Sequence, residues 1–274
     1  MKRSTLTTVG RPIDLSYPTN RAIAIASLLV MLGAPVFQRA AGTDWMRSIL
    51  WGAQAALSLF LAWALCRELD PDHDLAAFVA AGLCLVGLLL WGLPWFAVIF
   101  WLILVLRVVS RTMGAPAGLL DALGVLGLGI WLSLQGNWGY GVITTVALFL
   151  DSQLPRPALR QLGFAACGLI GTAAVALVGA DPPWGPISSP LAALIAVGIS
   201  VMFLPVIAEA RTISSRGDAS GEPLVPARVR SAQFIALLVG VHSAFLRGLP
   251  TLGALMPLWA AFLGAAVYWL WRAL

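Results

Sequence analysis

The sequence predicts an all-α integral membrane protein, a polytopic bundle of about ten transmembrane helices with its N-terminus and C-terminus in the cytoplasm. The first observation behind this prediction is composition. Hydrophobic residues make up 60% of the 274 residues and charged residues only 11%, whereas soluble domains carry about 25% charged residues. The second is that apolar runs long enough, or nearly long enough, to cross a bilayer recur along the whole chain. These runs lack the ten-residue alternation of barrel strands, so helices are expected.

Taken in order, ten runs are expected to span the bilayer, at 21–38, 48–66, 75–91, 94–110, 117–135, 138–152, 161–180, 188–209, 231–248 and 252–271. Several are shorter than about 20 residues and therefore need tilt or local thinning of the bilayer. The chain then divides into four parts: a polar cytoplasmic segment (1–20), an eight-helix membrane bundle (21–209), a flexible cytoplasmic linker (210–230), and two C-terminal membrane helices packed on the same bundle (231–274).

The basic residues give the third observation. Of the 17 Lys and Arg residues, a cytoplasmic N-terminus leaves only Arg39, Arg47 and Arg247 in outer segments, which is a strong positive-inside bias. Tryptophans gather at the predicted outer ends, as in an interfacial belt: Trp45, Trp51, Trp91, Trp95, Trp138 and Trp184. The sequence has no basic stripe interleaved with aromatic residues, so no nucleic-acid partner is expected. We expect a multi-pass protein of a bacterial cytoplasmic membrane, with the lipid bilayer as its surroundings.

The stretch "CRELDPDHDL" is unusual because it holds four of the 12 acidic residues of the chain, Glu68, Asp70, Asp72 and Asp74. We call residues 68–74 the acidic turn, and we expect it on the cytoplasmic side between the second and third spans. In the simpler interpretation, the Asp-Pro step ends one helix and an aspartate caps the next. The alternative is that Asp70, Asp72 and Asp74 bind Mg²⁺, because hard cations prefer several converging carboxylates.

Asp70 and Asp74, together with Asp151 between the sixth and seventh spans, resemble the aspartate-rich motifs in two cytoplasmic loops of the intramembrane prenyltransferases. The second loop carries one aspartate where that family has a pair. The resemblance implies a membrane-embedded lipid or prenyl-diphosphate enzyme that binds a metal-chelated diphosphate at the acidic turn and Asp151. Arg156 and Arg160 would then hold phosphate oxygens.

Charged and titratable residues inside the spans are the other candidates, because such groups are costly in a membrane when they are unpaired. Arg107 and Asp121 lie at similar depth in neighbouring spans, about 8–10 Å from the turn that joins them, so we expect them to pair. The alternative is that both extend to the cytoplasmic interface. His242 is the deepest titratable residue in the predicted spans. A histidine at this depth is expected either to act in a proton relay or to form a hydrogen bond to another helix.

The function that we favour is a small-molecule or metabolite transporter, because the size and orientation of the chain resemble those of the drug/metabolite transporter superfamily. Arg107, Asp121 and His242 would line its substrate pathway near mid-membrane. A lipid enzyme and a non-catalytic membrane component are the alternatives. The chain has no HExxH, GxSxG, Walker A or paired CxxC motif, so an enzyme is less expected, and no cofactor is expected outside the Mg²⁺ alternative.

Overall fold

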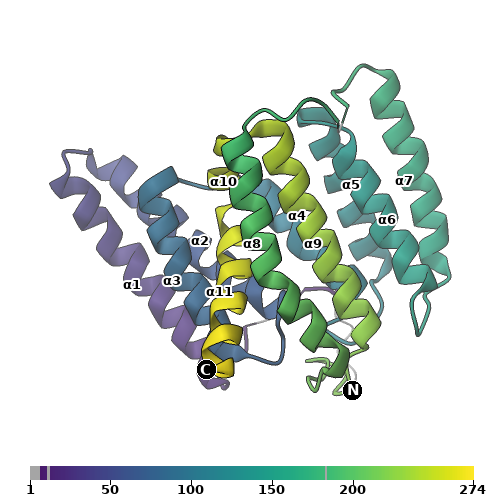
Figure 1. Ribbon diagram of the computed structural model, residues 1–274, viewed down its shortest axis with the longest axis horizontal. Helices are drawn as coiled ribbons and strands as arrows, with labels where there is room; N and C mark the ends of the chain where they lie inside the picture. Colours follow the sequence, from purple (N-terminus) through teal and green to yellow (C-terminus); the bar gives the residue numbers. More distant parts are fainter. Residues whose placement is uncertain (1–6, 11–12, 183) are drawn as a thin grey trace.

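The computed structural model describes residues 7–10, 13–182 and 184–274, and within these ranges the regular structure is helical, with only two isolated β-bridges. Figure 1 labels the α-helices. Their bounds are α1 Pro18–Ala40, α2 Trp45–Leu69, α3 Asp74–Trp91, α4 Phe96–Ser110, α5 Leu119–Gln135, α6 Gly139–Gln153, α7 Arg160–Leu177, α8 Pro190–Glu209, α9 Pro226–Arg247, α10 Leu249–Ala254 and α11 Met256–Ala273. A 3₁₀ turn, Ala210–Thr212, follows α8.

Each apolar run identified in the sequence contains a helix, with two differences at the C-terminal end. The helix expected from residue 231 begins at Pro226, since the fixed backbone angle of proline suits the first turn of a helix. The run 252–271 is not one helix, because α10 ends at Ala254 and α11 starts at Met256. Gly248 has a φ of 68°, a left-handed conformation that favours glycine, and it turns the chain sharply between α9 and α10.

In the described part of the chain, six helices are long and apolar enough to cross a membrane: α1, α2, α3, α7, α8 (extended through its 3₁₀ turn) and α9. The apolar helices α4 and α5 are shorter. Large apolar side chains are exposed along the outer helices, Leu177 and Ile170 of α7 among them. A protein with such surfaces is membrane-embedded, because these side chains have favourable surroundings in lipid and not in water.

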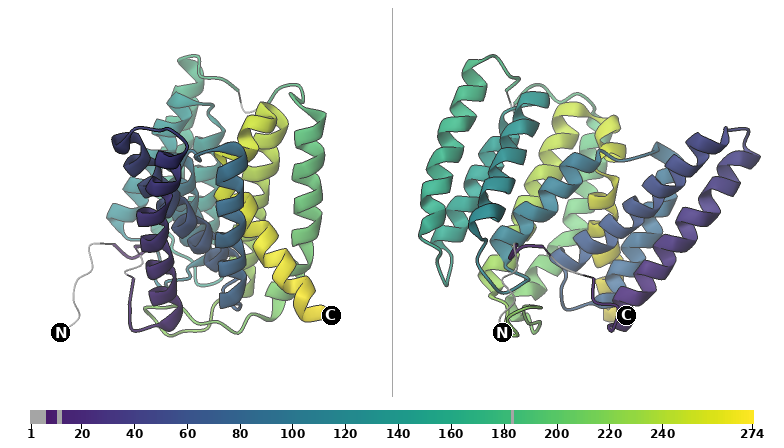
Figure 2. Two further views of the ribbon diagram at one scale, coloured as in Figure 1. Left: turned by 90° about the vertical axis from the view of Figure 1, so that its left-hand side faces the viewer. Right: turned by 180° about the vertical axis from the view of Figure 1, so that it is seen from behind.

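The helices form two groups with a shared centre, as Figures 1 and 2 show. In one group α1, α2, α3 and α11 pack together, and in the other α5, α6 and α7 do so. The helix α4 contacts both groups, α9 packs against α4 and α8, and α8 packs against α11. The two C-terminal helices therefore enter the bundle at separate places, with α9 beside α4 and α11 beside α3.

Small residues set how closely the helices approach. A Cβ on Gly264 of α11 would lie 2.5 Å from the backbone nitrogen of Ala80 in α3, so this crossing requires glycine. The sequence also suggests close helix approach at Gly124 and Gly127 of α5, but a Cβ at either position would meet no atom within 4 Å. The close contact of α5 lies instead at Gly129, against Thr144 of α6.

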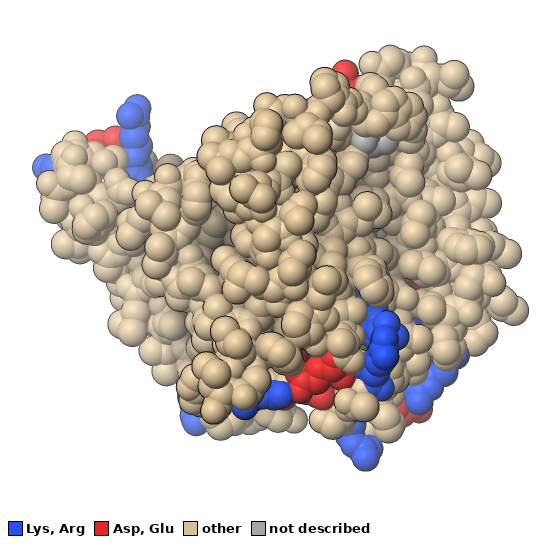
Figure 3. Space-filling model, in the orientation of Figure 1, with Lys and Arg blue, Asp and Glu red and all other residues tan. Residues whose placement is uncertain are grey.

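Charged side chains lie at the two ends of the bundle. On the face shown in Figure 3, blue and red atoms are concentrated at the lower end and at the tips of the upper end, with a broad uncharged belt between them. The lower end includes the acidic turn, the start of α9 and the C-terminus (Figures 1 and 2). We call this end, which also carries Arg67, Arg111 and Arg156, the arginine-rich end.

Candidate functional site

The acidic turn gives each of its carboxylates a different partner. Glu68 is fully buried, and its Oε1 accepts a hydrogen bond of 2.7 Å from Nε of Arg107, while its other oxygen accepts one from the Thr112 hydroxyl. Asp74, at the start of α3, forms an ion pair with Arg67. Two acids of the turn therefore neutralise arginines at the ends of α2 and α4, where an unpaired charge would be costly.

Of the two remaining acids, Asp70 has its partner within the turn, and Asp72 joins the turn to the segment that precedes α9. An oxygen of Asp70 lies 2.8 Å from Nδ1 of His73. Burial raises the pKa of Asp70 despite this contact, and the hydrogen bond that His73 donates to Asp70 raises the pKa of His73. Asp72 accepts hydrogen bonds from the backbone N–H groups of Ser214 and Ser215, at 2.9 and 2.8 Å. Burial alone would raise the pKa of Asp72, but the hydrogen bonds from both serines outweigh it and lower the pKa.

This arrangement does not gather the predicted metal ligands. The described residues contain no group of three or more His, Cys, Asp or Glu side chains that could hold a metal ion. Asp70, Asp72 and Asp74 point to separate partners, and Asp151 lies in another cluster. The cap interpretation is also incomplete, because the helix-capping residue before α3 is His73, without a side-chain cap, and Asp72 binds the segment that precedes α9.

Asp151, at the end of α6, is the centre of the second cluster. Its side chain is fully buried, and Oδ1 lies 2.7 Å from Nη2 of Arg111 and 2.7 Å from Nη1 of Arg228. Oδ2 is buried without a hydrogen-bond partner. These three side chains, which we call the Asp151 cluster, join α4, α6 and α9 at the arginine-rich end of the bundle.

Arg228 also satisfies carbonyl groups that the ends of two helices leave free. It donates to the carbonyl oxygens of Val109 at 3.1 Å, Pro155 at 2.8 Å and Arg156 at 3.2 Å. The carbonyl of Arg156 also accepts a 2.6 Å hydrogen bond from Arg111. Arg156 and Arg111 have φ values of 62° and 53°, and no other non-glycine residue of the described chain has a positive φ. The strained backbone therefore coincides with the cluster that holds it in place.

The expected pair between Arg107 and Asp121 does not form. Arg107 binds Glu68 and donates to the carbonyl oxygen of Val9 at 3.2 Å. Asp121 accepts hydrogen bonds from Thr7 and, at 2.7 Å, from the backbone nitrogen of Thr8. The sequence interpretation is wrong here because the segment around Val9, which is buried, folds back under α4 and α5 and binds both charges.

The proposed phosphate ligands also lie apart. Arg156 forms an ion pair of 2.9 Å with Glu222, in the segment that leads to α9. Arg160 donates to the carbonyl oxygen of Ala117, which also accepts a 3.0 Å hydrogen bond from Gln161. The two arginines therefore stabilise different loops.

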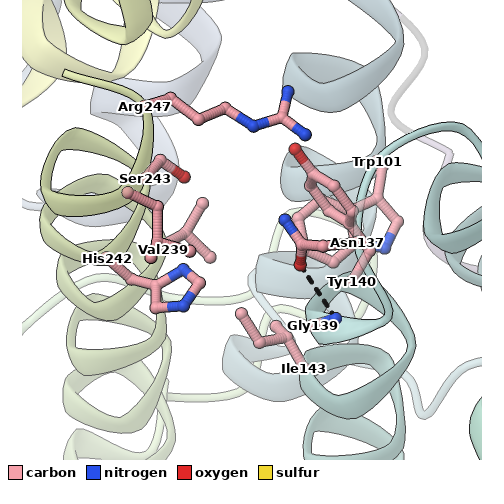
Figure 4. Close-up of a pocket in the computed structure, with 10 residues that line it drawn as sticks. Trp101, Asn137, Gly139, Tyr140, Ile143, Val239, His242, Ser243 and Arg247 are labelled. Atoms are coloured by element: carbon pink, nitrogen blue, oxygen red, sulfur yellow. Dashed lines mark hydrogen bonds between the residues drawn. The ribbon is translucent and has the colours of Figure 1, made fainter. Parts of the chain in front are cut away.

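His242 lies in a pocket between α4, α6 and α9, drawn in Figure 4. Its lining includes the polar or amphipathic side chains of Trp101, Asn137, Tyr140, Ser243 and Arg247. The pocket is small, with about 20 Å³ of free space, enough for roughly one water-sized group. It lies at the end of α9 opposite the Asp151 cluster (Figure 1). Of the three predicted pathway residues, only His242 lines this pocket.

Aromatic residues hold the wall of the pocket in place. The ring of Tyr140 meets Trp95 and Trp101 edge-on, with centroid distances of 6.3 and 5.2 Å. Nε1 of Trp101 donates to the hydroxyl of Thr144 at 2.9 Å, and the guanidinium of Arg247 lies 5.8 Å from the centre of the Trp95 ring. Figure 4 shows the Tyr140 hydroxyl directed toward this guanidinium. Sequence reasoning missed these residues, although Arg247 was one of few basic residues in the outer segments.

No protein-family model, curated protein or solved structure matches the chain. Neither the resemblance to the intramembrane prenyltransferases nor that to the drug/metabolite transporters is therefore supported by a match.

Proposed function

We propose that the protein is a membrane transporter for a small molecule, with its substrate path between α4, α6 and α9. The observation that carries the proposal is the pocket around His242, where polar side chains from two of these helices and the loop before α6 converge inside an otherwise apolar bundle. Ligand sites of this kind combine aromatic walls with a few oriented polar groups. Polar residues at membrane depth are costly and usually serve a pathway.

The arrangement at the other end of the same helices supports this proposal. The Asp151 cluster binds α4, α6 and α9 together at the arginine-rich end, so the path is closed there. A transporter exposes its site to the two sides in turn. In this structure ion pairs join the three helices at one end, and the polar pocket lies near the other end. This arrangement is expected of a transporter state that is closed toward one side of the membrane.

In the topology that we propose, α1–α9 and α11 are ten spans and the arginine-rich end faces the cytoplasm. The distribution of basic residues supports this orientation, since Arg39, Arg47 and Arg247 are the only ones assigned to outer segments. Trp184→Cys and Ala219→Cys, each in a chain whose exposed Cys167 is replaced by Ser, test it. A membrane-impermeant thiol reagent applied to intact cells should label the first and not the second. Labelling of both from outside would contradict the topology.

Transport itself is tested in proteoliposomes with a panel of radiolabelled organic acids, amines, amino acids and sugars. We expect at least one compound to accumulate above protein-free liposomes. Ser243→Phe should abolish that uptake, because its side chain would fill the small pocket. Ser200→Phe, which changes a half-buried serine of α8 outside the pocket, is the matched control. The proposal fails if no compound accumulates, or if uptake survives in Ser243→Phe.

A further inference from the structure

We infer that the pocket around His242 binds the carboxylate group of a small organic anion. The inference rests on the proposed function, since it takes this pocket as the ligand site, and it adds the chemical class of the ligand. It comes from the charges and hydrogen-bonding groups of the lining, which are unlike those of the two charged clusters at the other end of the bundle.

The charge of the lining is positive. Among the described residues that form the lining, Arg247 alone has a permanent charge, and none is Asp or Glu. None of the ion pairs within the described ranges includes Arg247, in contrast to Arg107, Arg111 and Arg228, which are each paired with a buried carboxylate. A guanidinium that is exposed beside the pocket, and that forms no ion pair among the described residues, attracts an anion and repels a cation.

The neutral groups of the lining offer donors. The side-chain oxygen of Asn137 accepts a 2.9 Å hydrogen bond from the backbone nitrogen of Gly139. This bond leaves the amide nitrogen as the free end of the side chain, and Figure 4 shows that it points away from Gly139. The Tyr140 hydroxyl and the Ser243 hydroxyl are further possible donors. The two oxygens of a carboxylate suit such a set, one facing the guanidinium and one facing the neutral donors.

The backbone is also shaped around the guanidinium. Gly136 precedes the turn into α6, and a Cβ there would lie 3.1 Å from Nη2 of Arg247 and 3.1 Å from the Tyr140 ring. A larger residue would push the guanidinium away from the phenol. The free space of about 20 Å³ is that of roughly one water-sized group, and the pocket is open to its surroundings, so one carboxylate oxygen enters the pocket and the remainder of the ligand lies at its mouth.

The inference is tested on the full chain in detergent, by the shift in melting temperature on titration with sodium acetate and sodium benzoate. Acetamide, methylammonium sulfate and sodium chloride are the matched probes, with ionic strength held constant by sodium sulfate. We expect saturable stabilisation by the carboxylates and none by the amide or the amine. If chloride stabilises the protein and the carboxylates do not, the assignment of the pocket to a carboxylate is overturned.

Two variants attribute the effect to the pocket. Arg247→Gln should weaken carboxylate binding at least about tenfold, because a hydrogen-bonded charge is lost. Arg247→Lys, which keeps the charge and loses the planar fork, should bind carboxylates several-fold more weakly than the natural chain. The control is Arg39→Gln, because Arg39 also lies 5.8 Å from a tryptophan ring, that of Trp45, and is remote from the pocket. Carboxylate stabilisation that persists in Arg247→Gln, or that disappears in Arg39→Gln, overturns the inference.

The two proposals fail in different ways. If amines or sugars are taken up, Ser243→Phe abolishes that uptake and carboxylates do not bind, the transporter proposal stands and the ligand class is overturned. Carboxylate binding that depends on Arg247, without uptake of any compound, would keep the ligand class and overturn the transporter.

Discussion

Replacing Asp151 by alanine is the perturbation that the structure predicts most sharply. The side chain of Asp151 is fully buried, and one of its oxygens accepts hydrogen bonds from two arginines, Arg111 and Arg228, which are themselves nearly inaccessible. The substitution removes the carboxylate with which both form ion pairs among the described residues, and it leaves two buried positive charges next to each other. Breaking a buried ion pair from one side costs about 3–5 kcal/mol.

That cost converts to a measurable change in melting temperature. At about 2–4 °C per kcal/mol for a chain of this size, a loss of about 3–5 kcal/mol lowers the melting temperature by about 6–20 °C. Tryptophan fluorescence of the purified protein in detergent reports the transition. Asp151→Asn keeps the volume and removes the charge, so it should reproduce most of the loss if the charge dominates.

The control is Glu222→Gln, which removes the ion pair with Arg156. Both partners of that pair are at least half exposed, so the loss should stay within about 1 kcal/mol. If Asp151→Ala lowered the melting temperature no more than Glu222→Gln, the reasoning would be refuted. The carbonyl groups around Arg111 and Arg228 would then be sufficient to hold both guanidinium groups.

Three further predictions concern packing and the loops. Gly264→Ala should destabilise the protein by about 1–3 kcal/mol, because the added Cβ would meet the backbone of Ala80. Gly124→Ala adds a Cβ in open space and should be neutral or stabilising by up to about 1 kcal/mol. Equal melting temperatures of the two variants would contradict this prediction. Asp72→Asn should speed tryptic cleavage after Arg216, because the acceptor that fixes the preceding serines loses its charge; unchanged cleavage would show that other contacts suffice. Because the pKa of Asp72 is lowered in the folded protein, the contact with the serines is complete above pH 3.8, the ordinary pKa of an aspartate. The contact weakens as the pH falls through the lower pKa of the folded state. The Ser215 amide should therefore lose its protection from hydrogen exchange only in that acidic range.

The helices were predictable because they follow from composition alone. An apolar run in a chain with few charges has to bury its backbone polar groups, and a helix does so within the run. The start of α9 was missed because Arg228 and Arg230 suggest a solvated linker. Arg228 is inside because a ring of carbonyl oxygens and one aspartate surround it, and no pattern within residues 210–230 contains that information.

The charged clusters were less predictable because their partners are far apart in the sequence. Equal depth suggested that Arg107 pairs with Asp121, yet Glu68 is separated from Arg107 by 39 positions and lies closer in space. The segment at Thr7 and Thr8 reaches Asp121 across more than a hundred positions. Contacts of this kind depend on how the helices are arranged, which composition and spacing leave open.

The helix α9 carries Arg228 near one end and Arg247 at the other, about 28 Å apart at 1.5 Å per residue. The helix is held by the Asp151 cluster at the first end, and further along by hydrogen bonds from Gln233 to the Leu69 carbonyl and from Ser188 to the Phe245 carbonyl, so Asp151 is the point about which it can tilt. A tilt of about 6° around that point would move the far tip by about 3 Å, roughly the diameter of a water molecule. Very small rotations at the anchored end are therefore enough to widen or shut the space beside Tyr140, with no helix needing to bend or unwind.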